Sequence, residues 1–179
     1  MAKEIEMKFL MDRAWATTHR SELEKMSFRK AALKRGYFDA QHDVGVITVD
    51  RLAGAGEGER FGMITSKTGA GLVREETEIM LPWEAARAAY CSCEHRISKV
   101  RYDVMVDGHH LEVDVFSGRH LGLVIGEIEF ESEEKAALFD PKSFPDHMLR
   151  LDVTLDPRFT NHKLATMSID EIVALISGR

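Results

Sequence analysis

The sequence has few cysteines, no excess of basic residues and no long hydrophobic run. Only Cys91 and Cys93 occur among its 179 residues. His95 follows them closely, but a structural zinc site normally takes four ligands from two separated pairs, and no second pair lies nearby. We therefore interpret the two cysteines as reduced, partly buried thiols, as expected of a cytosolic protein.

The balance of charge excludes further classes of protein. Lysine and arginine number 24 against 30 acidic residues, which gives a formal net charge of −6. General nucleic-acid binders and anionic-membrane binders usually carry a basic excess, so we expect neither nucleic acid nor membrane among the partners. A local cationic pocket for a small anion remains compatible with this balance.

Hydrophobic stretches are short throughout the chain. None approaches the ~20 apolar residues of a membrane-spanning helix. The N-terminal segment becomes charged at Lys3 and Glu4, so we expect no signal peptide there. The hydrophobic fraction of 44% and the charged fraction of 30% are those of globular proteins. A length of 179 residues suits one ordinary domain, and no linker or repeat divides the chain. We expect one cytoplasmic domain over residues 1–179.

The spacing of apolar residues predicts mainly antiparallel strands with a few helices. Strands are predicted at residues 4–10, 44–52, 60–67, 72–81, 97–106, 110–116, 123–131 and 151–155. Helices are predicted at residues 14–34, 83–89 and 132–139, and a last one begins with the capping-box spacing of residues 168–171. Asp107-Gly108 marks a tight turn. This composition indicates an α+β domain or a closed barrel.

Charged residues recur at every second position on strand after strand. They are Glu4, Glu6 and Lys8, then Lys67, then Arg74, Glu76 and Glu78, then Lys99, Arg101 and Asp103, then Glu112 and Asp114, then Glu127, Glu129 and Glu131. Glutamate and lysine are poor strand formers, so their repeated alternation requires an explanation.

Two arrangements would produce this alternation. A sheet with one solvated face is the interpretation that the pattern alone favours. The second is a barrel with a polar interior, in which carboxylates hold divalent cations while lysine and arginine bind phosphate oxygens. Acids and bases mixed on the same faces suit a site for a metal-bound polyanion, whereas either kind alone would not.

Ordered motifs along nearly the whole chain resemble one known family. Glu4-x-Glu6-x-Lys8 is similar to the ExExK motif of the CYTH superfamily, the triphosphate tunnel metalloenzymes. The motifs that match next, in order, are Gly36-Tyr37, Lys67 with Gly69-x-Gly71-Leu72-x-Arg74-x-Glu76-x-Glu78, Lys99-x-Arg101-Tyr102, Glu112-Val113-Asp114-Val115-Phe116-x-Gly118, Glu127-Ile128-Glu129-Phe130 and Val153-Thr154-x-Asp156-x-Arg158-Phe159-x-Asn161. An isolated ExExK is a weak signal, but the ordered set is specific. The chain most resembles the short, single-domain bacterial branch.

The resemblance implies a closed eight-stranded antiparallel β-barrel, or tunnel, with a polar interior and flanking helices. It implies metal-ligating roles for Glu4, Glu6, Glu127 and Glu129, and a second metal or an oriented water for Glu76, Glu78 and Asp114. The cations that resemble the triphosphate-binding set are Lys8, Arg51, Lys67, Arg74, Lys99 and Arg101. The catalytic candidates are Glu6, Glu78, Lys99 and Tyr37, and the implied cofactor is Mg²⁺ or Mn²⁺.

Two positions leave alternatives open. The family usually carries an Arg-x-Arg pair on the strand after Gly-Tyr, and here that stretch is Val49-Asp50-Arg51. The missing guanidinium removes a bidentate phosphate contact, which could weaken binding, shift the substrate or be compensated by a cation such as Arg60. Tyr37 is either a residue that restricts access at a tunnel mouth or a packed aromatic at a strand start.

The predicted function is hydrolysis of a small triphosphate, with inorganic tripolyphosphate as the preferred candidate. One alternative is a class IV-type adenylate cyclase that forms cyclic AMP from ATP. Another is a non-catalytic module that binds polyphosphate or nucleotide. The expected partner is the triphosphate itself, and a possible homodimer would associate through outer faces or helices because a closed barrel has no free strand edge.

Overall fold

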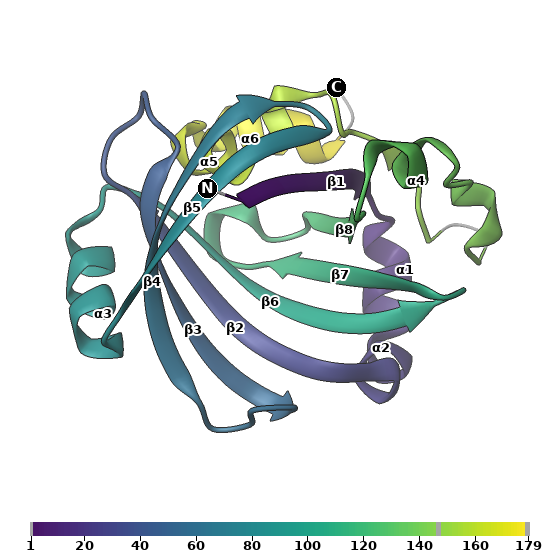
Figure 1. Ribbon diagram of the computed structural model, residues 1–179, viewed down its shortest axis with the longest axis horizontal. Coiled ribbons are helices and arrows are strands. Elements are labelled where there is room, and N and C mark those ends of the chain that lie inside the picture. Colours follow the sequence, from purple (N-terminus) through teal and green to yellow (C-terminus); the bar gives the residue numbers. More distant parts are fainter. Residues whose placement is uncertain (1, 146–147, 178–179) are drawn as a thin grey trace.

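Eight antiparallel strands close into a barrel in the computed structural model of the protein. The structure describes residues 2–145 and 148–177, and at residues 15–17 it describes the backbone alone. The strands are β1 (Ala2–Leu10), β2 (Ser27–Tyr37), β3 (Val44–Gly54), β4 (Arg60–Ala70), β5 (Val73–Leu81), β6 (His95–Val106), β7 (His109–Phe116) and β8 (Val124–Glu129). They pair in the order β5-β4-β3-β2-β6-β7-β8-β1, and β5 also pairs with β1 (Figure 1). The two-residue β9 (Leu151–Asp152) extends the sheet beside the end of β1. The predicted closed barrel is confirmed.

The first strand closes the barrel because its two halves pair with different strands. Residues 2–5 of β1 pair with β5, and residues 6–10 pair with β8. This register places Glu4 opposite Arg74 and Glu6 opposite Glu129. Directly opposite residues in antiparallel strands share a face of the sheet, so charges far apart in the sequence meet here.

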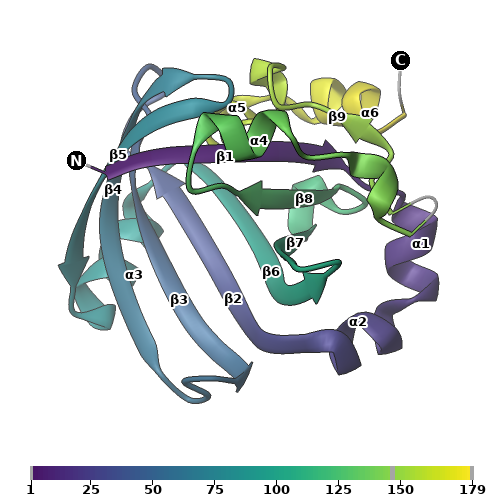
Figure 2. The ribbon, with the colours of Figure 1, turned by 45° about the vertical axis from the view of Figure 1, so that its right-hand side comes forward.

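Helices cover parts of the outer surface. The helices are α1 (Arg13–Thr18), α2 (Arg20–Met26), α3 (Trp83–Ser92), α4 (Glu133–Ala137), α5 (Asn161–Thr166) and α6 (Ile169–Ser177). α2 packs on β6 with α1 beside it, whereas α3 packs on β3 and β4 at the other side of the barrel (Figures 1 and 2). Within the described part of the chain, every helix is too short or too polar to cross a membrane.

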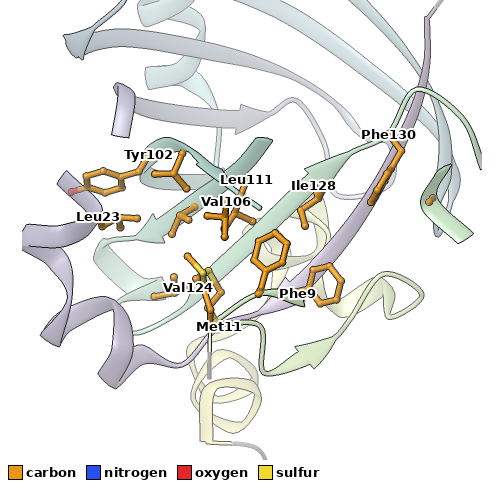
Figure 3. Packing of buried hydrophobic residues seen from close by; sticks show 14 of the residues in the cluster. Phe9, Met11, Leu23, Tyr102, Val106, Leu111, Val124, Ile128 and Phe130 are labelled. Atoms are coloured by element: carbon orange, nitrogen blue, oxygen red, sulfur yellow. The ribbon is translucent and has the colours of Figure 1, made fainter. Parts of the chain in front are cut away.

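The main hydrophobic core lies outside the barrel wall. Phe9 of β1 belongs to one buried cluster with Ile128 of β8, Leu111 of β7 and Tyr102 of β6. Leu23 of α2 lies beside Tyr102 at the edge of this cluster (Figure 3). The charged residues of the same strands occupy the alternate positions, so they point to the barrel interior. Of the two arrangements that the alternation allowed, the polar interior is the one observed.

A second core cluster connects the barrel to the C-terminal helices. Tyr37, Ile97, Phe116 and Ile125 have the same parity along their strands as the inward charges, and they pack with Leu164 and other residues of α5 and α6. The charged part of the barrel interior therefore ends against apolar side chains.

The predicted helix at residues 14–34 is wrong in its second half. α2 ends at Met26, and Ser27 begins β2. Because β2 pairs along nearly all its length with both β3 and β6, two ladders of backbone hydrogen bonds override the helical spacing of its apolar residues. The strand predicted at residues 151–155 is limited to β9, since the Asp152 carboxylate accepts a hydrogen bond from the Thr154 N–H and turns the chain.

Three local predictions are confirmed. Asp107 and Gly108 have positive φ angles of 48° and 78°, as a tight hairpin turn requires. The Glu171 N–H donates to Ser168 Oγ at 3.2 Å and the Ser168 N–H donates to Glu171 Oε2 at 2.7 Å, so the capping box forms. Both cysteines are free thiols, with Cys91 exposed and Cys93 buried.

His120 is a buried, neutral histidine that links the barrel to α5. Its Nε2–H donates to the Leu164 carbonyl oxygen at 2.8 Å, and its Nδ1 has no hydrogen-bond partner among the described residues. Burial holds the pKa of His120 below its usual value of 6.5. Because the unfolded chain binds this proton and the folded chain does not, the free energy of unfolding should fall as the pH drops below about 6.5.

Replacing this histidine should make the pH dependence of stability shallower. His120→Gln keeps a hydrogen-bond donor and removes the titration, so the slope of the unfolding free energy between about pH 5 and 6.5 should decrease by up to about 1.4 kcal/mol per pH unit. Denaturant unfolding at several pH values measures this slope. The same substitution at exposed His42 is the control for the exchange of side chain. Equal slopes for the wild type and His120→Gln would contradict the assignment.

Candidate active site

A cavity of about 280 Å³ lies inside the barrel. The charged side chains that line it are Glu4 and Glu6 of β1, Arg35 of β2, Lys67 of β4, Arg74, Glu76 and Glu78 of β5, Lys99 and Arg101 of β6, Glu112 of β7, and Glu127 and Glu129 of β8. Its apolar wall consists of Leu33, Ile47, Val49 and Met63. Asn161, the first residue of α5, also reaches the cavity. The alternating charges of the sequence therefore converge on one site.

The two glutamates of β1 share one arginine. Glu4 accepts hydrogen bonds from Lys67 Nζ at 2.7 Å and from Arg74 Nη2 at 3.2 Å. Glu6 Oε1 accepts from the same Arg74 Nη2 at 2.7 Å and from Lys8 Nζ at 2.8 Å. Burial disfavours the charged form of Glu6, yet Lys8 and Arg74 hold its pKa below the usual value. These hydrogen bonds fix both carboxylates in position.

Lys8 lies beneath the carboxylates, outside the cavity lining. Its Nζ donates to Glu127 Oε1 at 2.6 Å as well as to Glu6. Burial opposes the charge on Lys8, but Glu127 and Glu6 more than offset it and raise the pKa of the ammonium above its usual value. Burial likewise opposes the charge on Glu127, whose pKa Lys8, Lys99 and Arg101 hold well below the usual value. Lys8 thus neutralises two largely buried acids.

Asp114 lies behind the cavity lining and pairs with two cations that belong to it, Lys99 and Arg101. It is fully buried, and both its oxygens accept hydrogen bonds from Arg101, at 2.8 Å from Nε and 2.6 Å from Nη2. Lys99 forms an ion pair with the same carboxylate, and Arg101 forms another with Glu112. Burial lowers the pKa of Lys99, although Asp114 opposes the shift. Asp114 thereby fixes the position of the Arg101 guanidinium beside the cavity.

Negative charge is in local excess near β8 and β5. Glu129 and Glu78 line the cavity, and neither has an ion-pair partner within the described ranges. Burial raises the pKa of Glu129, and the nearby Glu4 and Glu6 raise it further. Burial also raises the pKa of Glu112, to about 7, although Arg101 lowers it. Crowded carboxylate oxygens of this kind fit a hard divalent cation such as Mg²⁺ or Mn²⁺.

A second group of possible metal ligands is already engaged by hydrogen bonds. Asp103, His110 and Glu112 have ligand atoms within 4.8 Å of one another. Asp103, however, accepts from Arg29 Nε at 2.7 Å and lies 2.9 Å from His110 Nε2. These contacts account for the group without a metal.

Two curated relatives identify the family to which the chain belongs. It is 34% identical over 167 residues to an inorganic triphosphatase of Acetivibrio thermocellus, covering 92% of this chain and 94% of that protein. It is 32% identical over 164 residues to an inorganic triphosphatase of Nitrosomonas europaea, covering 90% and 96%. The chain belongs to the inorganic triphosphatase family. No family model matches it.

A solved structure of the family shares the barrel. A crystal structure of an inorganic triphosphatase superposes with a TM-score of 0.59 at 26% identity, covering 94% of this chain and 97% of that one. The closed eight-stranded barrel described above is therefore the family fold.

Most residues that the family resemblance pointed to line the cavity. They are Glu4, Glu6, Glu76, Glu78, Glu127, Glu129, Lys67, Arg74, Lys99 and Arg101. Four others do not line it. Lys8 and Asp114 lie directly behind the lining and pair with residues that belong to it.

Tyr37 and Arg51 lie away from the cavity lining. Tyr37 is buried in the second core cluster with its ring 4.9 Å from that of His162, and burial raises its pKa above the usual value. The packed-aromatic interpretation describes this position, whereas access at a tunnel mouth does not. The guanidinium of Arg51 stacks 5.4 Å from the ring of Phe61.

Sequence reasoning missed Arg35, which lines the cavity. Its strand was predicted as the end of a helix, so its face could not be assigned. Tyr37 offered a signal, because residues two positions apart on a strand lie on the same face of the sheet. A strand that included both residues would have placed Arg35 on the same inward face as Tyr37. Arg60, the suggested substitute for the missing arginine, is instead paired with Asp50 at 2.7 Å and is not among the lining residues.

Proposed function

We propose that this protein hydrolyses a small triphosphate, inorganic tripolyphosphate in the first place, with a divalent metal. The observation that carries the proposal is one cavity of about 280 Å³ in which carboxylates of β1, β5 and β8 face cations of β4, β5 and β6. Acids and bases in one enclosed site suit a polyanion with its metal. The curated relatives, both named inorganic triphosphatases, support it. We further propose that residues 1–179 form one domain of the CYTH type.

The carboxylates of the cavity would hold the metal. Glu4, Glu6 and Glu129 surround the region of excess negative charge, and Glu76 and Glu78 offer oxygen ligands on the adjacent strand. A bound Mg²⁺ or Mn²⁺ supplies positive charge that neutralises and orients phosphate oxygens. Glu127 is already shared between Lys8 and Arg101, so we assign it a supporting position beside these ligands.

The cations of the cavity would bind the phosphate chain. Lys67, Arg74, Lys99 and Arg101 present fixed positive charge to it. In the reaction a water oxygen bonds to the terminal phosphorus and the bridging P–O bond breaks, which yields phosphate and pyrophosphate. Phosphoryl transfer depends mainly on positioning and on stabilising the charge of the transferring group. Asp114 positions Lys99 and Arg101, and we propose no substrate contact for Tyr37 and Arg51.

The apolar wall favours a second candidate substrate. Leu33, Ile47, Val49 and Met63 offer no partner to a phosphate oxygen, but they could contact the organic group of a nucleoside or thiamine triphosphate. An organic triphosphate therefore belongs in any substrate test.

A substrate panel tests the proposed function. Tripolyphosphate, ATP and thiamine triphosphate would each be incubated with Mg²⁺ and with Mn²⁺, and released phosphate and cyclic AMP would be measured separately. We expect phosphate release from tripolyphosphate that a chelator abolishes. Cyclic AMP formed from ATP would instead establish a cyclase. Tight binding of tripolyphosphate without metal-stimulated phosphate release would establish a binding module.

A further inference from the structure

Arg35 is a buried cation on the side of the cavity that otherwise carries the apolar wall. It is 6% exposed, and among the described lining residues it is the only charged one from β2 or β3. Its Nη2 donates to Thr65 Oγ1 at 2.8 Å and to Asp43 Oδ1 at 3.1 Å. Its buried Nε has no hydrogen-bond partner in the described part of the chain. An unmatched buried donor of this kind is costly unless a ligand satisfies it.

Asp43 connects this guanidinium to a second one. While its Oδ1 accepts from Arg35, its Oδ2 lies 3.6 Å from Arg74 Nη1. The Asp43 carbonyl oxygen also accepts from the Lys67 N–H at 2.9 Å, which fixes the loop before β3 against β4. Two arginines thus share one carboxylate at the same wall of the cavity. Arg35, Arg74 and Asp43 together carry one net positive charge, although Arg74 also pairs with the two glutamates of β1.

The register of β2 and β3 explains why Val49 leaves room for Arg35. Arg35 pairs with Ile47, and Leu33 pairs with Val49, so Arg35 and Val49 are diagonal neighbours on the inward face. Diagonal positions have their Cα atoms about 7–8 Å apart, within reach of a long side chain. An arginine at position 49 would bring a further positive charge to this region, whereas valine leaves the space to the guanidinium of Arg35.

We propose that Arg35 binds a phosphate group of the substrate and supplies from β2 the guanidinium that β3 lacks at Val49. This inference rests on the proposed function. Arg35 and Arg74 together contact one end of the phosphate chain, and an incoming phosphate oxygen satisfies the buried Arg35 Nε–H, which has no hydrogen-bond partner among the described residues. Arg35 acts in binding, so it affects KM more than kcat.

The first test removes the charge at position 35. Arg35→Gln should raise KM for tripolyphosphate about 10- to 100-fold, with a smaller change in kcat, because a charge-assisted contact is lost. Lys34→Gln is the matched control: the same strand loses the same charge at an exposed, outward position, and KM should stay within about twofold. Thermal unfolding of both variants checks the fold. If Arg35→Gln does not fold, Arg35→Lys, which keeps the charge but loses the fork, should show an intermediate rise in KM.

The second test moves the guanidinium to the neighbouring strand. Val49→Arg in the Arg35→Gln background should recover part of the lost affinity, whereas Val49→Arg in the wild type should bring no gain because two guanidinium groups would compete for one place. A folded Arg35→Gln variant with unchanged KM and unchanged affinity for tripolyphosphate would overturn the inference. Calorimetric binding of tripolyphosphate distinguishes this failure from a failure of the proposed function, because binding is measured whether or not phosphate is released.

Discussion

Glu6→Gln should lower metal-dependent phosphate release by at least about 100-fold. The substitution removes a buried negative charge that Arg74 and Lys8 both contact, and with it an oxygen that we propose as a metal ligand beside Glu129. A neutral amide binds Mg²⁺ more weakly and also releases the two cations from their fixed positions. Turnover of tripolyphosphate at saturating Mg²⁺ or Mn²⁺ measures the effect.

The matched control for this substitution is Glu75→Gln. Glu75 lies on β5 one position from Arg74, is exposed and faces outward, so the same chemical change should leave turnover within about twofold. Circular dichroism and thermal unfolding confirm that each variant is folded. A folded Glu6→Gln variant with wild-type turnover would remove Glu6 from the metal site.

Lys8→Met should lower the free energy of unfolding by about 3–5 kcal/mol, since removing one partner of a buried ion pair leaves the other charge uncompensated. Lys8 is 6% exposed and donates to both Glu6 and Glu127, so two buried carboxylates each lose one of their cationic partners at once. The pKa values of these acids should rise, and stability is then lost as the pH rises through them. The deficit should consequently shrink toward about pH 5.

Lys3→Met is the control for the stability measurement. Lys3 lies on the same strand, is exposed and pairs with exposed Glu133, so the expected loss is about 0.5 kcal/mol or less. Urea unfolding at about pH 5 and pH 8 gives both values. An equal loss in the two variants, or a deficit in Lys8→Met that is independent of pH, would contradict the role of Lys8 as the buried counter-ion.

The sequence predicts the direction of side chains better than their depth. Alternation along β1 and β6 correctly places Glu6 and Lys99 on inward faces, because a strand has a fixed period of two. It does not distinguish Lys99, which lines the cavity, from Asp114, which lies behind it. How far a side chain lies from the cavity depends on the tilt of the strands and on which long side chains cover a shorter one such as Asp114. The closed barrel was predicted from the family resemblance, because the alternation of charges alone favoured a sheet with one solvated face.

The error at β2 has a similar physical origin. Ala31 and Leu33 lie among charges at spacings that suit a helix, and lysine and alanine are good helix formers. The strand forms because it lies between β3 and β6, whose residues come later in the sequence. Pairing over such distances is not visible in a local window. Missing this strand also concealed Arg35, which among the described residues is the one cation lining the cavity that the resemblance does not anticipate.

The divided pairing of β1 has a consequence for how the protein is made. The first strand leaves the ribosome early, yet half of it must wait for β8 before its backbone groups are paired. At about 5–20 residues per second the wait is on the order of ten seconds. During that time Ile5 and Phe9 have no cover, which favours aggregation. A nascent chain that stops before β8 lacks both the closed wall and Glu127, one of the two partners of Lys8, so the site can form only after β8 has been synthesised.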